Sequence, residues 1–178
     1  HIEYIQVYPD VENTSVRISV KVVGSSRLSI VALYQKEIMG VADVNAVDGL
    51  VDVIINLKEA HLWEVGNGRL YGLQLSFDED YVTSYFGLRS VRMDGKKFLL
   101  NGQSVFQRLV LDQGFYPEGI YTAPSDEALI RDIQISLAAG FNGARLHEKV
   151  FESRFLYHCD RLGHMVWGES GSWGVDIS

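Results

Sequence analysis

The stretch SDEALIRDIQISLAAGFNGARLH (residues 125 to 147) predicts a helix that is followed directly by a strand. Ser125 is a favoured N-cap residue, and Asp126 and Glu127 suit the positive end of the helix dipole. Gly140 is placed to end the helix, and FNGARLH then has the composition of a strand. The apolar residues that recur at helical spacing are Leu129, Ile130, Ile133 and Leu137.

The same plan recurs on both sides of this stretch. ESRFLYHCDRLG (152 to 163) predicts a second helix with Gly163 as its stop, and HMVWGE (164 to 169) predicts the strand after it. With a first strand that ends at LDQG (111 to 114), this half of the chain is expected to have the order β-α-β-α-β. Strands joined by single helices run parallel and are covered by those helices.

Three such strands are too few for a complete α/β barrel, which needs about 250 residues. We therefore expect residues 93 to 178 to form an incomplete α/β (TIM-type) barrel segment, with the rest of the barrel C-terminal to Ser178. The alternative is a small, complete α/β module whose last strand is an edge.

Residues 1 to 92 show a different hydrophobic periodicity. SVRISVKVV (15 to 23) places Val16, Ile18 and Val20 on one face of a strand, and this period of two indicates one buried face. Short strands separated by turn-prone residues are typical of an antiparallel β-sandwich. Further strands of this kind are expected at 27 to 35, 51 to 57, 68 to 77 and 84 to 93.

Two hairpin turn signals, Asp94-Gly95 and Asn101-Gly102, mark the change between the halves. They predict that residues 97 to 100 pair back onto SVFQRLVLD (104 to 112).

Composition excludes several classes of function. A formal charge of -7 disfavours nucleic-acid binding, and no apolar run is long enough to span a membrane. A lone Cys159 excludes an intramolecular disulfide and a structural zinc set. The N-terminus lacks the features of a signal peptide, so we expect a soluble, trimmed piece of a protein whose compartment the sequence leaves unknown.

Polar side chains gather where the parallel strands are expected to end, which is where functional groups project in α/β barrels. These residues are Asp112 and Gln113 after the first strand, Arg145, His147, Glu148 and Lys149 after the second, and Trp167 and Glu169 after the third.

Several motifs, in this order, resemble glycoside hydrolase family 2, which includes β-galactosidases, β-glucuronidases and β-mannosidases. They are LWEVGNGRLYGLQL (62 to 75), FGLRSVRMDGKKFLLNGQSVFQRLV (86 to 110), DEALIRDIQISLAAGFNGARLH (126 to 147), DRLG (160 to 163) and VWGE (166 to 169). The resemblance implies an immunoglobulin-like sandwich at 1 to 92 and the first βα units of a (β/α)8 catalytic barrel at 93 to 178.

The resemblance further implies part of a retaining, β-galactosidase-like β-glycosidase, which cleaves β-linked sugars with two carboxylates. Both catalytic glutamates of the family lie beyond this sequence, so the fragment is expected to be inactive alone and to hold no catalytic residue. Its partners would be a carbohydrate substrate and, through the open barrel edge, a second copy of itself, with no nucleic acid and no membrane.

Within the site, the resemblance assigns Arg145 a role in holding the catalytic carboxylates ionised and oriented. Glu169 aligns with a magnesium ligand of some β-galactosidases, but Gly171 or Ser172 replaces the nearby histidine. We therefore expect no metal and no cofactor.

Three further residues are substrate-site candidates. Asp112 can accept hydrogen bonds from sugar hydroxyls, Trp167 can stack on a pyranose ring, and His147 lies in a loop that departs from the family's Ser-His-Tyr-Pro.

Plainer interpretations remain open for these residues. Arg145 could simply pair with Glu148 or Glu169, His147 could be an ordinary surface residue, and Trp167 could belong to the core. Glu148 and Lys149 are expected to form a solvated charge pair.

Two other functions remain open as well. A scaffold domain is disfavoured by the polar strand ends. A non-catalytic carbohydrate-binding module would need exposed aromatic residues on one sandwich face. The aromatic residues of the first half fall mostly in apolar strand patterns instead: Tyr4, Tyr8, Tyr34, Trp63, Tyr71 and Phe77.

Overall fold

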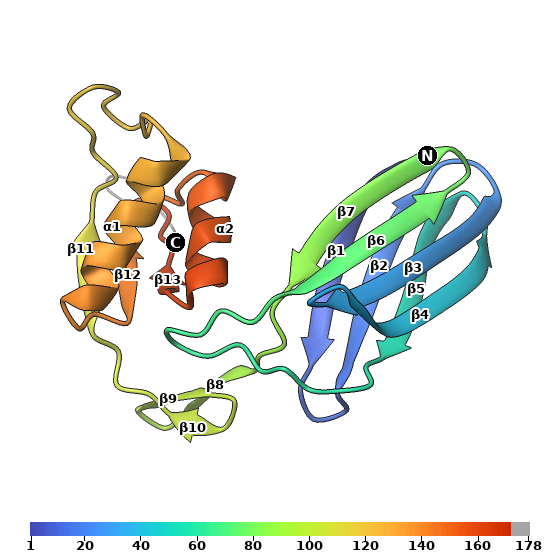
Figure 1. Cartoon of the computed structure of the whole chain (residues 1–178), viewed down its shortest axis with the longest axis horizontal. Coiled ribbons are helices and arrows are strands. Elements are labelled where there is room, and N and C mark those ends of the chain that lie inside the picture. The colour runs from blue at the N-terminus through green and yellow to red at the C-terminus, as the bar shows by residue number, and fades with distance from the viewer. Residues whose placement is uncertain (172–178) are drawn as a thin grey trace, which may run out of the picture. The chain divides into compact units, whose positions relative to one another are not determined.

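A computed structural model describes residues 1 to 171 and divides the chain into two compact units (Figure 1). The first unit comprises His1–Trp63 and Arg69–Ser104, and the second comprises Glu64–Gly68 and the chain from Val105 onward. The sequence placed the change of domain at residues 92 to 93, and that domain assignment stays a prediction.

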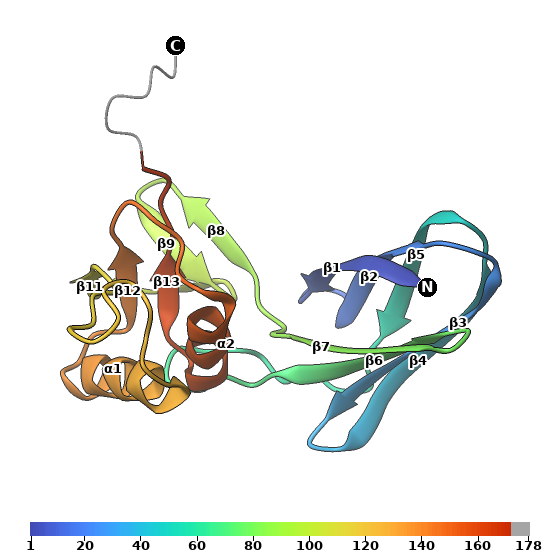
Figure 2. The ribbon, with the colours of Figure 1, turned by 90° about the horizontal axis from the view of Figure 1, so that it is seen from above.

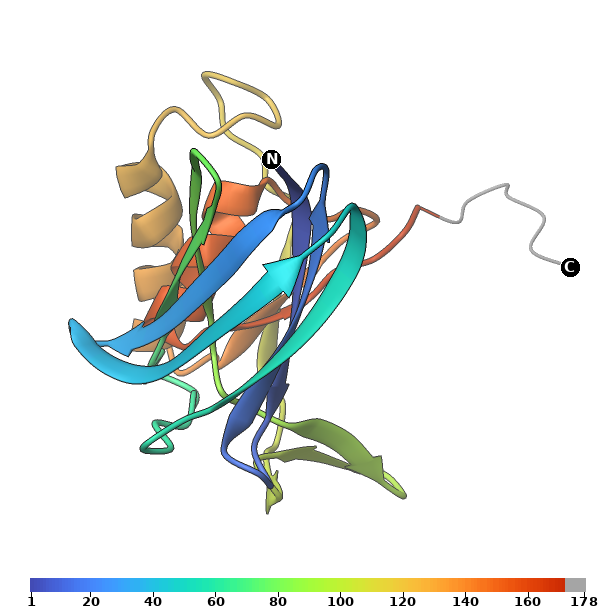
Figure 3. The ribbon, with the colours of Figure 1, turned by 90° about the vertical axis from the view of Figure 1, so that its right-hand side faces the viewer.

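The first unit contains two antiparallel sheets that share one hydrophobic core, as the sequence predicted for a β-sandwich (Figures 1 and 3). The three-stranded sheet has the order β1-β2-β5 and the four-stranded sheet the order β4-β3-β6-β7. The strands are β1 (Ile2–Asp10), β2 (Ser15–Val22), β3 (Ser26–Tyr34), β4 (Glu37–Ala46), β5 (Gly49–Asn56), β6 (Tyr71–Phe77) and β7 (Asp80–Phe86). The immunoglobulin-like assignment stays a prediction.

Alternation along β2 accounts for the packing of this core. Val16, Ile18 and Val20 are all fully buried, as predicted, and the neighbouring strands contribute apolar side chains to the same cluster. The strands β1 and β4 were not predicted from the sequence, because β1 carries apolar residues on both faces and Gly40 interrupts β4.

A small sheet of β8 (Val91–Asp94), β9 (Lys97–Leu100) and β10 (Gln103–Ser104) completes the first unit. Both glycine-containing turns occur as predicted, with positive φ at Gly95, Asn101 and Gly102. The predicted partner of β9 was wrong in part: β9 pairs with β8 and with Gln103–Ser104, and the pairing does not continue along residues 105 to 112.

The second unit has the predicted β-α-β-α-β order. Its elements are β11 (Leu109–Asp112), α1 (Asp126–Ala138), β12 (Gly143–Leu146), α2 (Ser153–Leu162) and β13 (Met165–Trp167). The strands form a parallel sheet in the order β11-β12-β13. The Ser125 hydroxyl accepts a hydrogen bond from the Ala128 N–H at the start of α1, and Gly163 ends α2 in the left-handed conformation.

Figure 2 shows both helices on one side of this sheet. Ala144 and Leu146 of β12 are buried and pack with Leu129 and Ile133 of α1 and with residues of α2. Since successive side chains of a strand point to opposite faces, Arg145 lies on the face away from the helices. The described structure thus covers one face of the parallel sheet with helices.

The short segment Glu64–Gly68 packs against the end of α2. The Gly66 N–H donates a hydrogen bond of 2.8 Å to the Gly163 carbonyl oxygen. A Cβ added to Gly68 would lie 2.2 Å from the Asp160 carbonyl oxygen and 2.4 Å from that of Arg161. Only a glycine fits this approach between two backbone segments.

We predict that Gly68→Ala destabilises the second unit by about 2 to 3 kcal/mol, because backbone cannot move aside as a flexible side chain can. Unfolding in denaturant, followed by helical circular dichroism, measures the change. Gly72→Ala is the matched control, since a Cβ there meets only the Leu33 Cβ at 4.0 Å. Equal stability of the two variants would contradict the packing described for Gly68.

Candidate functional site

An ion pair between Arg145 and Glu169 lies at the carboxyl ends of the parallel strands. Arg145 is the third residue of β12, and Glu169 follows β13 by two positions. The Nε and Nη2 groups of Arg145 donate to the two carboxylate oxygens of Glu169, the Nη2–Oε2 distance being 3.2 Å. This two-bond geometry fixes the plane of the guanidinium. Of the two partners considered for Arg145, the structure selects Glu169.

The carboxylate of Glu169 also holds the loop after β12. Its Oε2 atom accepts a hydrogen bond of 3.1 Å from the Glu148 N–H. This bond and the Arg145 guanidinium hold the pKa of Glu169 below its usual value, so the carboxylate is charged at neutral pH. Glu148 has a φ of 57°, in the left-handed region that non-glycine residues seldom occupy. Glu169 therefore fixes both a side chain and a strained loop residue.

A row of side chains crosses the sheet face that the helices leave open. Leu111, Arg145 and Trp167 are in register on β11, β12 and β13. Trp167 is 48% exposed and Leu111 is 52% exposed, so neither is a core residue in the described part of the chain. The row combines a flat aromatic ring with an oriented guanidinium.

Asp112 lies on the other side of the sheet. It is the last residue of β11 and is in register with the buried Leu146. Its Oδ1 atom accepts a 2.8 Å hydrogen bond from the Gly114 N–H, which turns the chain at the strand end. Burial raises the pKa of Asp112. The sequence predicted one cluster at the strand ends, and the structure separates Asp112 from Arg145 by the thickness of the sheet.

His147 and Lys149 tie the loop after β12 to the end of β11. The His147 N–H donates to the Asp112 carbonyl oxygen at 3.0 Å, and its ring Nδ1 lies 2.9 Å from the Gln113 side-chain nitrogen. Lys149 donates to the Gln113 carbonyl oxygen at 2.9 Å. The solvated pair expected between Glu148 and Lys149 is not formed among the described residues, since Lys149 turns toward Gln113 instead.

Tyr121 is a neighbour of this group that the sequence did not predict. The Lys149 ammonium lies 4.3 Å from the centroid of its ring, a cation–π contact. Lys149 and Tyr121 border a hollow of about 180 Å³ whose other walls include Phe151 and Phe155. Tyr121 lies outside any helix or strand, so no sequence periodicity could predict which way its side chain points.

No group of three or more His, Cys, Asp or Glu residues between residues 1 and 171 is arranged to hold a metal ion. Of the two residues expected to replace a histidine ligand, Gly171 lies near the Glu148 carbonyl oxygen, and Ser172 lies outside the described residues. In the same part of the chain, no helix is long and apolar enough to cross a membrane.

We predict that Glu169→Ala loosens the loop of residues 147 to 150, because the Glu148 N–H and the Arg145 guanidinium both lose their acceptor. Backbone 15N relaxation should show larger fast motion in that loop and unchanged values in α1. Asp43→Ala, which removes an exposed ion pair with Arg27 in the sandwich, is the control. A loop as rigid as in the unmodified chain would contradict the role given to Glu169.

Comparison with known proteins found relatives among β-galactosidases. The chain is 25% identical over 128 residues to a β-galactosidase of Staphylococcus xylosus, covering 72% of the chain and 13% of that protein. It is 30% identical over 128 residues to a β-galactosidase of Thermoanaerobacterium thermosulfurigenes, covering 67% of the chain and 17% of that protein. The chain thus spans less than a fifth of these relatives.

Solved structures share the fold over nearly all of the chain. A β-glucuronidase of Faecalibacterium prausnitzii matches 96% of the chain and 28% of that protein, with a TM-score of 0.83 and 24% identity. A β-glucuronidase of Dictyoglomus thermophilum matches 96% and 29%, with a TM-score of 0.84 and 20% identity. The model of the family described as glycosyl hydrolases family 2 matches residues 1–89, half of the 178 residues. The chain belongs to glycosyl hydrolases family 2.

Proposed function

We propose that this chain is part of a retaining β-glycosidase, in which an immunoglobulin-like sandwich precedes the first βα units of a (β/α)8 catalytic barrel. The observation that carries the proposal is the parallel sheet β11-β12-β13, which has helices on one face and the Arg145–Glu169 pair on the other. Membership of the family and the shared fold support it. The chain spans only a small part of its relatives, so the remaining strands would come from the same longer protein.

The proposed substrate is a β-linked, β-galactoside-like sugar. In the two-carboxylate reaction one carboxyl group protonates the leaving oxygen while the other attacks, with the groups roughly 5 to 5.5 Å apart in retaining enzymes. Both carboxyl groups would lie on later barrel strands, so the chain alone is proposed to be inactive.

Arg145 would act on these carboxylates through charge. A guanidinium beside a carboxylate lowers its pKa, which keeps a nucleophile ionised at neutral pH. The bidentate contact with Glu169 holds the guanidinium in place, so Glu169 would be a positioning residue. Trp167, in the same row, would offer its ring to the sugar.

Asp112 and His147 would serve the loops around the pocket. Asp112 turns the chain after β11, and His147 joins that turn to the loop after β12 through Gln113. We place both beside the sugar pocket as supports of its wall, in agreement with their hydrogen bonds. Neither residue is proposed to transfer a proton.

The unpaired edges of β11 and β13 would allow two copies of the isolated chain to associate. Sedimentation velocity over a wide concentration range tests this. Species that grow with concentration are expected, and a single monomer at all concentrations would contradict the idea.

Arg145→Ala in the longer protein should lower kcat/KM for nitrophenyl β-galactoside by about a hundredfold or more, as expected when a preorganised charge is removed. The acid limb of its pH profile should move to higher pH, because a carboxylate without its guanidinium has a higher pKa.

Nitrophenyl β-glucuronide and β-mannoside assayed beside the galactoside would define the sugar. Arg27→Ala, which breaks the exposed Arg27–Asp43 pair in the sandwich, is the matched control and should keep full activity. Turnover by the 178-residue chain alone, or full activity of Arg145→Ala, would overturn the proposal.

A further inference from the structure

The outer face of the β1-β2-β5 sheet carries aromatic side chains that the core does not use. Ile5 and Val7 of β1 pack on the core, so the alternate residues Tyr4, Gln6 and Tyr8 point outward. Tyr4 is 47% exposed and Tyr8 is 42% exposed. Most aromatic residues of the first half do belong to apolar patterns, since Trp63, Tyr71 and Phe77 are buried, but Tyr4 and Tyr8 are the exceptions.

Strand register arranges this outer face as three cross-strand rows. The rows are Tyr8–Arg17–Ile54, Gln6–Ser19–Asp52 and Tyr4–Lys21–Leu50. Each outer row ends on a tyrosine at β1 and on an exposed aliphatic residue at β5, and the middle row is polar throughout. Tyr4 and Tyr8 lie four residues apart, roughly 13 Å along the strand. A short oligosaccharide spans that distance, whereas a single sugar does not.

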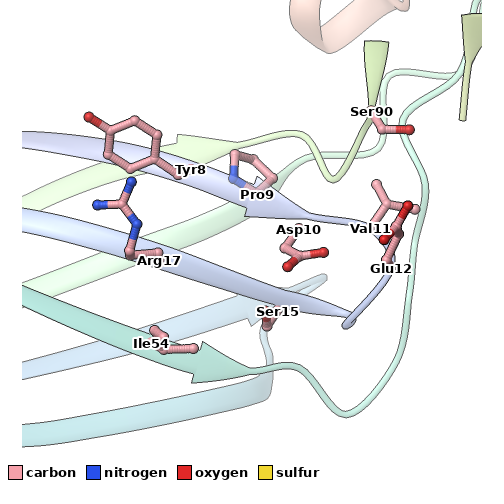
Figure 4. Close-up of a pocket in the computed structure, with 9 residues that line it drawn as sticks. All are labelled: Tyr8, Pro9, Asp10, Val11, Glu12, Ser15, Arg17, Ile54 and Ser90. Carbon is pink, nitrogen blue, oxygen red and sulfur yellow. The ribbon is translucent and has the colours of Figure 1, made fainter. Parts of the chain in front are cut away.

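Arg17 holds the ring of Tyr8 in place. Its guanidinium carbon lies 3.9 Å from the centroid of that ring, and Figure 4 shows the guanidinium directed toward it. The Nη1 group donates to the Ser19 hydroxyl at 3.0 Å and to the Asp52 carboxylate at 3.1 Å. The Tyr8 hydroxyl donates to the Gln6 side-chain oxygen at 2.7 Å. The ring is thus oriented before any ligand arrives.

Arg17 also keeps hydrogen-bonding capacity for a ligand. Its contacts with Ser19 and Asp52 both use Nη1, which leaves the Nε and Nη2 donors without a protein acceptor in the described part of the chain. The Arg17 side chain is 43% exposed. Donors at a fixed position beside an aromatic ring suit a ligand with hydroxyl groups.

A hollow of about 430 Å³ adjoins this end of the face. Its lining includes Tyr8, Arg17 and Ile54 from the sheet, Asp10 at the end of β1, and Glu12 from the turn after β1 (Figure 4). Pockets of a few hundred Å³ hold small ligands, with a few polar groups fixing their orientation. An aromatic ring, hydrogen-bond donors and hydrogen-bond acceptors therefore line the same pocket.

We propose that this face of the sandwich binds a neutral oligosaccharide. The Tyr8 ring would stack on the apolar face of a pyranose, while Arg17 donates to its hydroxyls and Asp10 or Glu12 accepts from them. The charge of Arg17 is already balanced by Asp52, and the two further carboxylates repel anionic chains. A neutral, hydroxyl-rich ligand fits this balance.

A protein partner fits the same face less well. The cores of protein interfaces are depleted in Lys, Asp, Glu and Ser, although they favour Tyr and Arg. Here the buried Ser19 and the charged Lys21 lie on the central strand β2, and Asp52 separates Leu50 from Ile54 along β5. The mixture of isolated rings and polar groups is that of a sugar surface. The inference does not depend on the glycosidase activity proposed above.

The test titrates the 15N-labelled 178-residue chain with β-1,4-galactotetraose, cellotetraose and xylotetraose, with glucose and a tetragalacturonate for comparison. One of the neutral tetrasaccharides should shift amide signals of β1, β2 and β5, and the monosaccharide and the anionic chain should bind far more weakly. Tyr8→Ala should weaken binding about tenfold, the size expected for one lost aromatic stack. Tyr8→Phe should retain the stack and hence most of the affinity.

Tyr81→Ala is the matched control, because Tyr81 is 62% exposed on β7 of the other sheet. Unshifted core amides show that each variant folds, and Tyr4→Ala tests the same face if Tyr8→Ala fails to fold. No shift with any tetrasaccharide, or equal weakening by Tyr81→Ala, would overturn the proposal. So would shifts of these amides on concentrating the chain without sugar, which would assign the face to a second copy. Activity of the longer protein plays no part in the readout, so failure here is distinguishable from failure of the glycosidase assignment.

Discussion

A parallel sheet is stable only when both of its faces are covered, and this constraint governs the second unit. Helices α1 and α2 bury Ala144 and Leu146 on one face of β12. On the opposite face Leu111 and Trp167 remain about half exposed on either side of Arg145. Closing the sheet into a barrel would cover that face and both strand edges. The proposed place of this chain at the start of a catalytic barrel follows from that need.

The open face of the sheet carries a charged pair, Arg145 and Glu169, whose geometry is already fixed by residues of this chain. Glu169 satisfies Arg145 through two oxygens and also binds the Glu148 N–H, so one carboxylate fixes a guanidinium and a loop. A preorganised charge costs no reorganisation during a reaction, which is why such pairs suit catalytic sites. A similar arrangement occurs in the sandwich, where Asp52 binds Arg17 and the Arg17 guanidinium packs on the ring of Tyr8. In both units, therefore, a neighbouring acid fixes the position of an arginine on an open sheet face.

Local signals in the sequence predicted most helices and strands. The features that were not predicted depend on contacts between residues far apart in the sequence. Ser125, Gly140 and the apolar period defined α1, and alternation defined β2, because these patterns are read within one element. The separation of Asp112 from Arg145 depends on the register between β11 and β12, which no single strand encodes. The left-handed Glu148 depends on a carboxylate 21 residues away. The outward direction of the Tyr8 side chain was not predicted, because β1 carries apolar or aromatic residues on both of its faces.

Hydrogen exchange at the amides of β11 and β13 tests most directly whether this sheet continues into a barrel. The measurement compares the 178-residue chain with the longer protein that is proposed to contain it. We predict that in the longer protein both outer strands become as protected as β12, because each gains a neighbouring strand. Outer-strand amides that exchange equally fast in both proteins would contradict this, and would show the sheet to be a small, complete α/β module.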